Sequence, residues 1–371
     1  MTSENQSITQ VEISGFRGLD SLKIEKTGLI NILVGNNGVG KTSVLEAIHM
    51  ACSGNQPMEF VNVNYGRGLS AHGTTLIADA FFNQFNTNKK PKCALTLANG
   101  KKQSIEMSWE QPMAVNNIYI PKEQNELTTS ATTQAEKVDL GSLTLTYSHP
   151  TQGSIESTQH KSIIDFIQNG MSTRRQAGCT HCIVSKFLSF KVQVNNDPAK
   201  LYSELERKGN KLSFDEMLRQ VDMRVESINV TAETTPPSLT VKLKNNATFL
   251  PIALLGDGMQ RAMQFATFFY TPNIKVLCID EIDAGLHRDA MQGLWQAIYS
   301  VCKEKSIQLF CTTHDEQMIT AAIEAIEAVE GDKCDLYVQK VIRRDDGSIV
   351  VRSQDCNDIS NLQQANFDIM A

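Results

Sequence analysis

Residues 35–42, Gly-Asn-Asn-Gly-Val-Gly-Lys-Thr, match the phosphate-binding pattern G-x-x-x-x-G-K-[ST] at every fixed position. Glycines let backbone N–H groups close around phosphate oxygens, and the start of the next helix adds partial positive charge. Lys41 supplies a mobile cation, and the Thr42 hydroxyl is placed to ligate Mg²⁺. The sequence therefore predicts a nucleotide site made by Gly35, Asn36, Asn37, Gly38, Val39, Gly40, Lys41, Thr42 and Ser43.

Paired carboxylates follow an apolar run in the C-terminal half. Residues 276–279 are apolar and lead directly into Asp280 and Glu281, which is the Walker-B pattern. In this pattern the first carboxylate holds Mg²⁺ through its water shell, and the second polarises the attacking water. We expect Thr42 and Asp280 to hold the metal, and Glu281 to act with Lys41 in catalysis.

Both motifs depend on the elements beside them, because the loop needs a strand before it and a helix after it. Residues 29–34 are a short apolar run typical of a buried parallel strand, and residues 43–51 have helical apolar spacing. Further along, strands and helices alternate, which predicts a parallel sheet covered by helices. These later elements are strands at 276–280 and 308–312, helices at 290–301 and 316–329, and a hairpin of 335–342 with 349–352.

The remaining segments predict an antiparallel β layer and a helical insertion. Residues 8–34 resemble a small β-meander, and residues 55–72 and 122–137 are expected to be loops. Further strands are expected at 76–85, 94–97, 103–109, 118–120 and 143–147. Helical spacing is seen in Ile163, Ile164, Phe166 and Ile167, and again in Ile183, Val184, Phe187 and Leu188. We expect an N-terminal lobe (1–150), a helical insertion (151–227) and a C-terminal lobe (228–371).

A Phe16-Arg17 pair stands shortly before the G-x-N-G-x-G-K-T loop. This arrangement resembles the head of ABC-type ATPases of the SMC/RecF/OLD group. The resemblance implies an α/β fold: a mixed or parallel sheet with covering helices, plus an antiparallel β layer, here with the helical insertion. It also implies that Arg17 reaches a nucleotide phosphate, to which a structural ion pair is the alternative.

The string Leu255-Gly256-Asp257-Gly258-Met259-Gln260-Arg261 occupies the place of the ABC signature motif, ahead of a helical run at 259–270. The resemblance implies that Gly256, Asp257 and Gly258 contact the nucleotide held by a second copy, so that dimerisation completes the site. The family form is Leu-Ser-Gly-Gly, and Gly256 stands where its serine would be. A serine contact therefore cannot be carried over, and a plain helix-capping turn is the alternative.

Two further strings resemble motifs of this group. Asp283-Ala284-Gly285-Leu286-His287 is similar to the D-loop, which makes Asp283 a nucleotide-contacting candidate. His314 follows the strand at 308–312, where the group keeps its switch histidine, and could hydrogen-bond the γ-phosphate. A plain surface histidine is the alternative. Gln84 is a candidate for the glutamine loop.

Composition limits the other functions. The net charge of −6 excludes a protein coated in basic surface, so any DNA contact must be local or come from a partner. The two densest basic clusters are Lys89, Lys90, Lys92, Lys101 and Lys102, and Arg174 and Arg175 with Lys186. For both, a solvated face is favoured over a nucleic-acid contact. No membrane span or signal peptide is recognisable, so we expect a cytoplasmic protein.

The nine cysteines are expected to be reduced, many of them filling the core. Cys179 and Cys182 form one C-x-x-C, which is half of a zinc site. Zinc shared between two chains is one interpretation, and unpaired thiols are the favoured one.

Together these features predict an ATPase that forms a homodimer around two ATP–Mg²⁺ and signals to an effector by opening and closing. We expect the ATPase of an anti-phage defence system, similar to small OLD-type proteins without a Toprim domain, whose nuclease or toxin is a separate chain. One alternative is a RecF-like repair ATPase that binds DNA itself. Another is a nucleotide-gated scaffold with little turnover.

Overall fold

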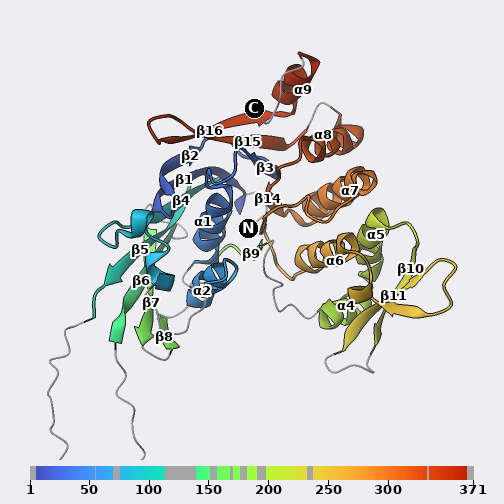
Figure 1. Cartoon of the computed structure of the whole chain (residues 1–371), viewed down its shortest axis with the longest axis horizontal. Coiled ribbons are helices and arrows are strands. Elements are labelled where there is room, and N and C mark those ends of the chain that lie inside the picture. The colour runs from blue at the N-terminus through green and yellow to red at the C-terminus, as the bar shows by residue number, and fades with distance from the viewer. Residues whose placement is uncertain are drawn as a thin grey trace, which may run out of the picture.

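The computed structural model describes residues 6–54, 56–69, 76–112, 139–150, 157–167, 170–175, 182–189, 198–231, 237–331 and 334–365. The strand expected at 118–120, the loop expected at 122–137 and Cys179 lie outside these residues. Two sheets enclose one central helix, and further helices cover the outer side of the second sheet (Figure 1).

The central sheet has the strand order β16-β15-β3-β14-β13-β9. Its strands are β3 (Ile30–Val34), β9 (Ser185–Leu188), β13 (Val276–Ile279), β14 (Gln308–Thr312), β15 (Leu336–Arg343) and β16 (Ile349–Asp355). Neighbouring strands are parallel except for the antiparallel hairpin β15–β16. Every residue of β3, β13 and β14 is buried, which explains why most of their side chains are apolar.

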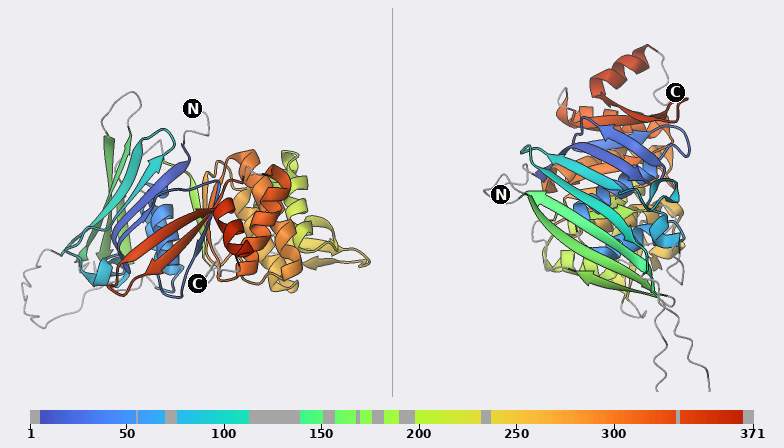
Figure 2. Two further views of the ribbon diagram at one scale, coloured as in Figure 1. Left: turned by 90° about the horizontal axis from the view of Figure 1, so that it is seen from above. Right: turned by 90° about the vertical axis from the view of Figure 1, so that its left-hand side faces the viewer.

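Helices cover both faces of this sheet (Figures 1 and 2). On one face lies α1 (Lys41–Ser53), and on the other lie α6 (Asp257–Phe269), α7 (Arg288–Lys305) and α8 (Glu316–Glu330). Successive strand residues point to opposite faces, so each strand contributes to two cores. Leu277 and Leu309 pack in the core with α6 to α8, whereas Cys278 and Phe310 pack in the core with α1.

A seven-stranded antiparallel sheet lies on the far side of α1, in the order β2-β1-β4-β5-β6-β7-β8. Its strands are β1 (Ile8–Phe16), β2 (Leu19–Ile24), β4 (Lys92–Leu97), β5 (Lys102–Glu110), β6 (Asp139–Pro150), β7 (Ser157–Ile167) and β8 (Gly170–Arg175). Its inward side chains, such as Val11, Leu95 and Leu145, pack with α1. The expected antiparallel layer is confirmed, and α1 is buried between two sheets.

A smaller unit packs against α6 and α7 at the other end (Figure 1). It contains α4 (Pro198–Arg207), α5 (Lys211–Val221) and a three-stranded sheet of β10 (Val225–Thr231), β11 (Ser238–Leu243) and β12 (Phe249–Pro251). A 3-10 turn, Ile252–Leu254, then leads to α6. No helix within the described residues is long and apolar enough to cross a membrane.

The helices predicted around Ile163–Ile167 and Ile183–Leu188 are wrong. The first is the end of β7, in which Ile164 and Phe166 face the core, and the second contains β9, paired with β13. Adjacent pairs of apolar residues suit one side of a helix as well as a strand, and strand pairing decides between them. β7 pairs with its sequence neighbours β6 and β8, and β9 pairs with the distant β13. Within the described part of residues 151–227, helix is confined to α4 and α5.

Three predictions before residue 86 also need correction. Residues 57–65, expected to be loop, form α2 (Pro57–Tyr65), with a proline at its start. Residues 76–85, expected to be a strand, form α3 (Leu76–Asp79) and the 3-10 turn Asn83–Phe85. The meander is also broken, because β3 leaves β1 and β2 for the central sheet.

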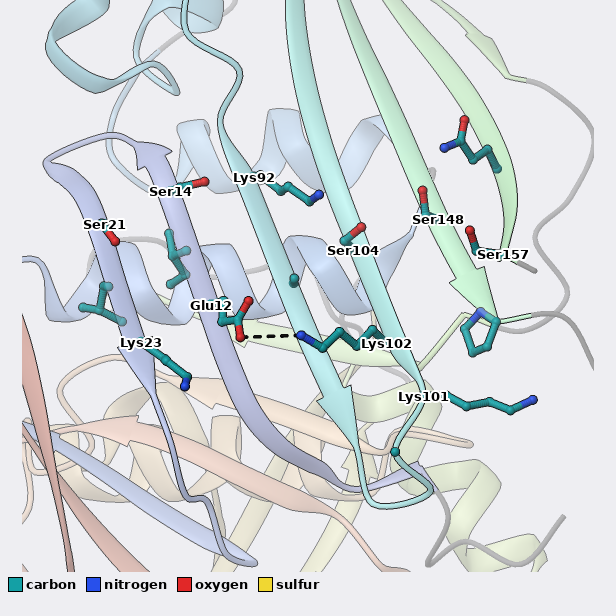
Figure 3. Close-up of a pocket in the computed structure, with 16 residues that line it drawn as sticks. Glu12, Ser14, Ser21, Lys23, Lys92, Lys101, Lys102, Ser104, Ser148 and Ser157 are labelled. Carbon is teal, nitrogen blue, oxygen red and sulfur yellow. Dashed lines mark ion pairs between the residues drawn. The ribbon is translucent and has the colours of Figure 1, made fainter. Parts of the chain in front are cut away.

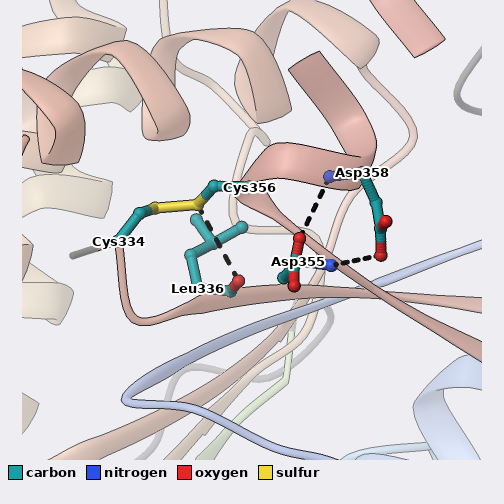
Figure 4. Close-up of a disulfide and its surroundings, with 5 residues drawn as sticks. All are labelled: Cys334, Leu336, Asp355, Cys356 and Asp358. Atoms are coloured by element: carbon teal, nitrogen blue, oxygen red, sulfur yellow. Dashed lines mark hydrogen bonds between the residues drawn. A yellow bond between two sulfur atoms is a disulfide. The ribbon is translucent and has the colours of Figure 1, made fainter. Parts of the chain in front are cut away.

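The cysteines are only partly as expected. Cys52, Cys93, Cys278, Cys302 and Cys311 are buried thiols that fill the core. Cys334 and Cys356, however, form a disulfide (Figure 4). The hairpin β15–β16 explains the pairing, because it brings the two Cα atoms to 6.2 Å despite a separation of 22 residues. The disulfide ties the start of β15 to the start of α9 (Cys356–Gln364).

Candidate nucleotide-binding site

Three neighbouring parallel strands bring the predicted motifs to one edge of the central sheet. The phosphate loop follows β3, Asp280 follows β13, and His314 lies two residues beyond β14, the strand between them. The carboxyl ends of parallel strands are where open α/β sheets bind ligands. The fold therefore assembles residues from both halves of the chain at one place.

The loop needs glycine where it approaches other parts of the chain. Gly35 has φ 134°, and a Cβ there would lie 2.3 Å from the Val341 carbonyl oxygen. Gly40 has φ 109° and begins α1, and its Cβ would lie 2.6 Å from a Leu19 methyl carbon. No side chain caps α1, which leaves its first amide groups without a side-chain acceptor.

Lys41 folds back onto this loop. Its Nζ donates hydrogen bonds to the carbonyl oxygens of Gly35, at 2.6 Å, and Asn36, at 3.1 Å. Burial lowers the pKa of Lys41, and the charges of Asp280 and Glu281 oppose this shift. The ammonium group is therefore held at the mouth of the loop by carbonyl oxygens that a phosphate can replace.

The Asp280 carboxylate joins the two motifs. The Thr42 Oγ1 donates to both of its oxygens at 3.1 Å, and the Thr312 Oγ1 donates to Oδ1 at 2.8 Å. Asp280 is buried, so these hydroxyls replace water around its charge. A hydroxyl and a carboxylate in contact form an all-oxygen donor set, which suits Mg²⁺.

Glu281 has an unusual backbone conformation, with φ 50°. Its N–H donates to the Thr312 Oγ1 at 2.8 Å, and its carbonyl accepts a hydrogen bond from Arg261 at 3.2 Å. The residue is partly exposed. Its carboxylate can therefore reach a water molecule at the sheet edge while its backbone is fixed from both sides.

The signature turn, residues 256–258, lies at the start of α6, as the sequence predicts. Gly256 and Asp257 are exposed, whereas a Cβ at Gly258 would lie 2.8 Å from the Gly285 carbonyl oxygen of the D-loop segment. The Asp283 Oδ1 is buried without a hydrogen-bond partner among the described residues. The turn is therefore open on one side and packed against the D-loop on the other.

His314 is exposed at the same sheet edge. Gln84 is also exposed, with φ 56° in the 3-10 turn Asn83–Phe85.

Arg17 makes the contacts of a structural ion pair, which is the alternative to binding a nucleotide phosphate. Its Nε lies 2.7 Å from the Glu46 Oε2, and its guanidinium also donates to the Asn64 Oδ1 at 2.7 Å. It packs over the rings of Phe16 and Phe81. Burial lowers the pKa of Arg17 to about 10, against the opposing charge of Glu46. Arg17 and Glu46 of α1 therefore form a buried ion pair.

Two arginines that the sequence analysis does not single out touch the motifs. Arg67 donates to the Glu46 Oε1 at 2.6 Å and to the Ser43 Oγ at 3.2 Å, and its side chain is 35% exposed. Burial lowers the pKa of Arg67, but the hydrogen bond and charge of Glu46 outweigh this, so the pKa is raised. Arg261 contacts the backbone of the Walker-B residues. Arg67 has no fixed spacing from a motif that could have revealed it, whereas Arg261 is the last residue of the signature string at 255–261, whose pattern does not predict the backbone contact.

Cys182 is partly buried, and its expected zinc partner Cys179 lies outside the described residues. No group of three His, Cys, Asp or Glu side chains suitable for a metal occurs in the part of the chain that the structure describes. The shared zinc site stays untested.

Comparison with known proteins agrees with this geometry. The family model described as "AAA ATPase domain" matches residues 7–319. An "ATP/GTP phosphatase" of Helicobacter pylori is 22% identical over 93% of this chain and 95% of its own length. The "Septu protein PtuA" of Bacillus thuringiensis is 33% identical, but over only 21% of this chain and 20% of its own length.

Among solved structures, an Smc head domain with an extended coiled coil, bound to the C-terminal domain of ScpA and derived from Pyrococcus furiosus, has the same fold. Its TM-score is 0.51 at 13% identity, with 96% of this chain and 98% of that chain covered. The chain belongs to the AAA ATPase domain family, whose activity is ATP hydrolysis, and it has the fold of an Smc head domain.

Proposed function

We propose that this ATPase works as a homodimer that closes around two ATP–Mg²⁺ and signals to a separate effector. The observation that carries the proposal is the contact between Thr42 and Asp280, which joins the phosphate loop to the Walker-B carboxylates within one chain. The signature turn presents the exposed Gly256 and Asp257. A helix start exposed in this way can meet the phosphate held by a second copy.

Each side chain at the edge then has one role. Lys41 and the loop amides bind the phosphates, Thr42 and Asp280 hold Mg²⁺, and Glu281 orients the attacking water. The metal, when bound, neutralises charge that develops on the phosphate oxygens. His314 contacts the γ-phosphate and responds to its loss, and Asp283 lines the same site.

We assign the effector to a nuclease or toxin on another chain, in anti-phage defence. Support comes from the OLD-like Glu-x-Asp-x-Gly-Leu-His string at residues 281–287 and from the match to the Septu protein PtuA. Opening and closing of the dimer converts the ATP state into a conformational signal. The family assignment favours this enzyme over a scaffold without turnover.

Glu281→Gln tests the assignment, because the amide keeps the shape of the side chain and cannot accept a proton from water. We expect kcat to fall by about 100-fold or more, with ATP affinity unchanged. We also expect a stable ATP-bound dimer, measured by light scattering after size exclusion. Glu324→Gln, on the exposed side of α8, is the matched control. Unchanged turnover of Glu281→Gln would refute the role of Glu281.

The defence assignment has its own test in the host. Cells that carry this gene with its neighbouring genes should resist phage, and cells with Glu281→Gln should not. Equal plating of phage on both strains, with both proteins expressed, rejects the defence role and leaves the ATPase assignment standing.

A second candidate, direct DNA binding, is favoured by the outer face of the seven-stranded sheet (Figure 3). A concavity of about 1020 Å³ there is lined by Lys23, Lys92, Lys101 and Lys102, with Glu12 as its carboxylate. Serine hydroxyls lie among these lysines, and both groups bind backbone phosphates. This face is a local basic surface on a protein of net charge −6.

Duplex binding at several salt concentrations tests the second candidate. We expect Lys92→Gln with Lys102→Gln to reduce the slope of log affinity against log salt by about 2. No binding by the unaltered protein at low salt excludes direct DNA contact.

A further inference from the structure

We propose that Arg261 is a positioning residue that holds the backbone of Glu281 in its working conformation. The inference rests on the proposed function of Glu281 and adds a residue to that site. Arg261 lies in α6, 19 positions before Asp280 and 20 before Glu281, and its side chain is buried.

One guanidinium nitrogen of Arg261 binds two successive peptide groups. The Nη2 donates to the Asp280 carbonyl at 2.7 Å and to the Glu281 carbonyl at 3.2 Å. These carbonyls belong to the peptide planes before and after Glu281. Arg261 therefore contacts both planes whose rotation defines the direction of the Glu281 side chain.

The opposite side of the same two planes is held by Thr312. Its Oγ1 accepts from the Glu281 N–H at 2.8 Å, and its carbonyl accepts from the Ile282 N–H at 3.0 Å. All four backbone polar groups flanking Glu281 are thus hydrogen-bonded. Such a clamp is needed, because φ 50° is unfavourable for a residue with a side chain.

Arg261 is itself fixed in place. Its Nη1 donates to the Gln264 Oε1 at 3.1 Å, and its guanidinium lies 5.0 Å from the centre of the Phe265 ring. Burial lowers the pKa of Arg261 to about 10, against the charges of Asp280, Glu281 and Asp283, so the group stays cationic at neutral pH.

The choice of acceptors distinguishes positioning from an ordinary ion pair. Arg261 binds carbonyl oxygens, whereas the Asp280 carboxylate accepts from Thr42 and Thr312. The Asp280 carboxylate therefore keeps its own hydroxyl partners. Because Arg261 extends from the helix that the signature turn begins, it ties that helix to Glu281.

The main test replaces Arg261 with methionine, which keeps length and apolar contact but cannot donate. We expect Arg261→Met to lower kcat by about 10- to 100-fold, because the misplaced Glu281 no longer orients water. ATP affinity should change by less than about two-fold, since no phosphate contact is removed. Arg219→Met is the matched control, because Arg219 also donates to a backbone carbonyl, that of Glu226, from a side chain of α5 that is 32% exposed. Its kcat should equal that of the unaltered enzyme.

A double variant shows whether Arg261 acts through Glu281. If it does, Arg261→Met in the Glu281→Gln background causes no further loss beyond about two-fold. Losses that multiply would mean an independent structural effect and would overturn the inference. Unaltered kcat of Arg261→Met also overturns it.

Arg261→Lys covers the case in which the methionine variant does not fold. Lysine donates but cannot reproduce the guanidinium geometry, so we expect kcat about 3- to 10-fold below normal with ATP binding retained. Normal kcat of Arg261→Lys rejects the inference. If Glu281→Gln leaves turnover unchanged, the proposed function fails first; a loss in Glu281→Gln with none in the Arg261 variants rejects only the present inference.

Discussion

The phosphate loop and the signature turn both start a helix with glycine, yet their surroundings differ. At the start of α1, Lys41 contacts the loop carbonyls and Thr42 contacts Asp280, all within one chain. At the start of α6, Gly256 and Asp257 are exposed, and Gly258 packs against Gly285. The start of α1 is in contact with the edge of the central sheet, whereas the start of α6 is exposed to solvent.

This difference shows which parts of the site a single chain can prepare alone. The Walker residues are already in contact, so little reorganisation is needed when nucleotide and metal bind. The signature turn contacts Gly285 through Gly258, and its residues Gly256 and Asp257 are exposed to solvent. ATP binding should therefore depend on the first region, and hydrolysis on both.

The largest expected effect is at the enclosed helix start. Gly35→Ala places a methyl group 2.3 Å from the Val341 carbonyl, at φ 134°, so the loop must move. We expect ATP affinity to fall by about 100-fold, measured by calorimetry. Gly209→Ala, at φ +75° with nothing within 4 Å, is the control and should bind ATP normally. Equal affinity of both variants would show that the close approach at Gly35 is unimportant.

A smaller and more selective effect is expected at the open helix start. Gly256 has no atom within 4 Å of its Cβ position and no positive φ, so Gly256→Arg should fold normally. We expect hydrolysis to fall by about 10- to 30-fold through loss of the contact with a second copy, with ATP affinity of the monomer unchanged. Val329→Arg adds the same charge at an exposed position of α8 and should keep full activity. Full hydrolysis by Gly256→Arg would place the complete site within one chain.

The smallest effect is expected for a substitution of Arg17, which pairs with Glu46 of α1. Arg17→Lys keeps the charge beside Glu46 but loses the second donor and the stacking on Phe16 and Phe81. We expect the free energy of unfolding, from urea titration, to fall by about 1 kcal/mol. ATP affinity should stay within about two-fold, because Arg17 is engaged by protein groups. A ten-fold loss of ATP affinity would contradict a purely structural role and indicate that Arg17 contacts a phosphate.

Local patterns predicted the elements that carry the motifs. β3 with α1, the strand β13 before Asp280, and the hairpin β15–β16 were all recognisable, because strand, helix and turn preferences there agree with the final fold. β7 and β9 were assigned to helices instead. β9 pairs with β13, which is far away in sequence, and β7 pairs with its neighbours β6 and β8, a pairing that the apolar spacing within residues 163–167 does not reveal.

In the candidate site too, the residues that local sequence patterns predict are those that belong to motifs. Lys41, Thr42, Asp280 and Glu281 lie in motifs with fixed spacing, and the fold brings them together. Arg67 and Arg261 act through contacts across 21 and 19 positions, which depend on how α1 and α6 pack. Such contacts leave no pattern in a single sequence.

The Thr312 hydroxyl has a further consequence, since it gives the site a fixed hydrogen-bond direction. Its single proton goes to Asp280, so only its lone pair can face the Glu281 N–H. The Glu281 amide therefore donates to Thr312, and Thr312 donates to Asp280. Thr42 donates to the same carboxylate. The chain of bonds requires Asp280 to act as an acceptor. One hydroxyl thereby links the Asp280 carboxylate to the backbone N–H of Glu281.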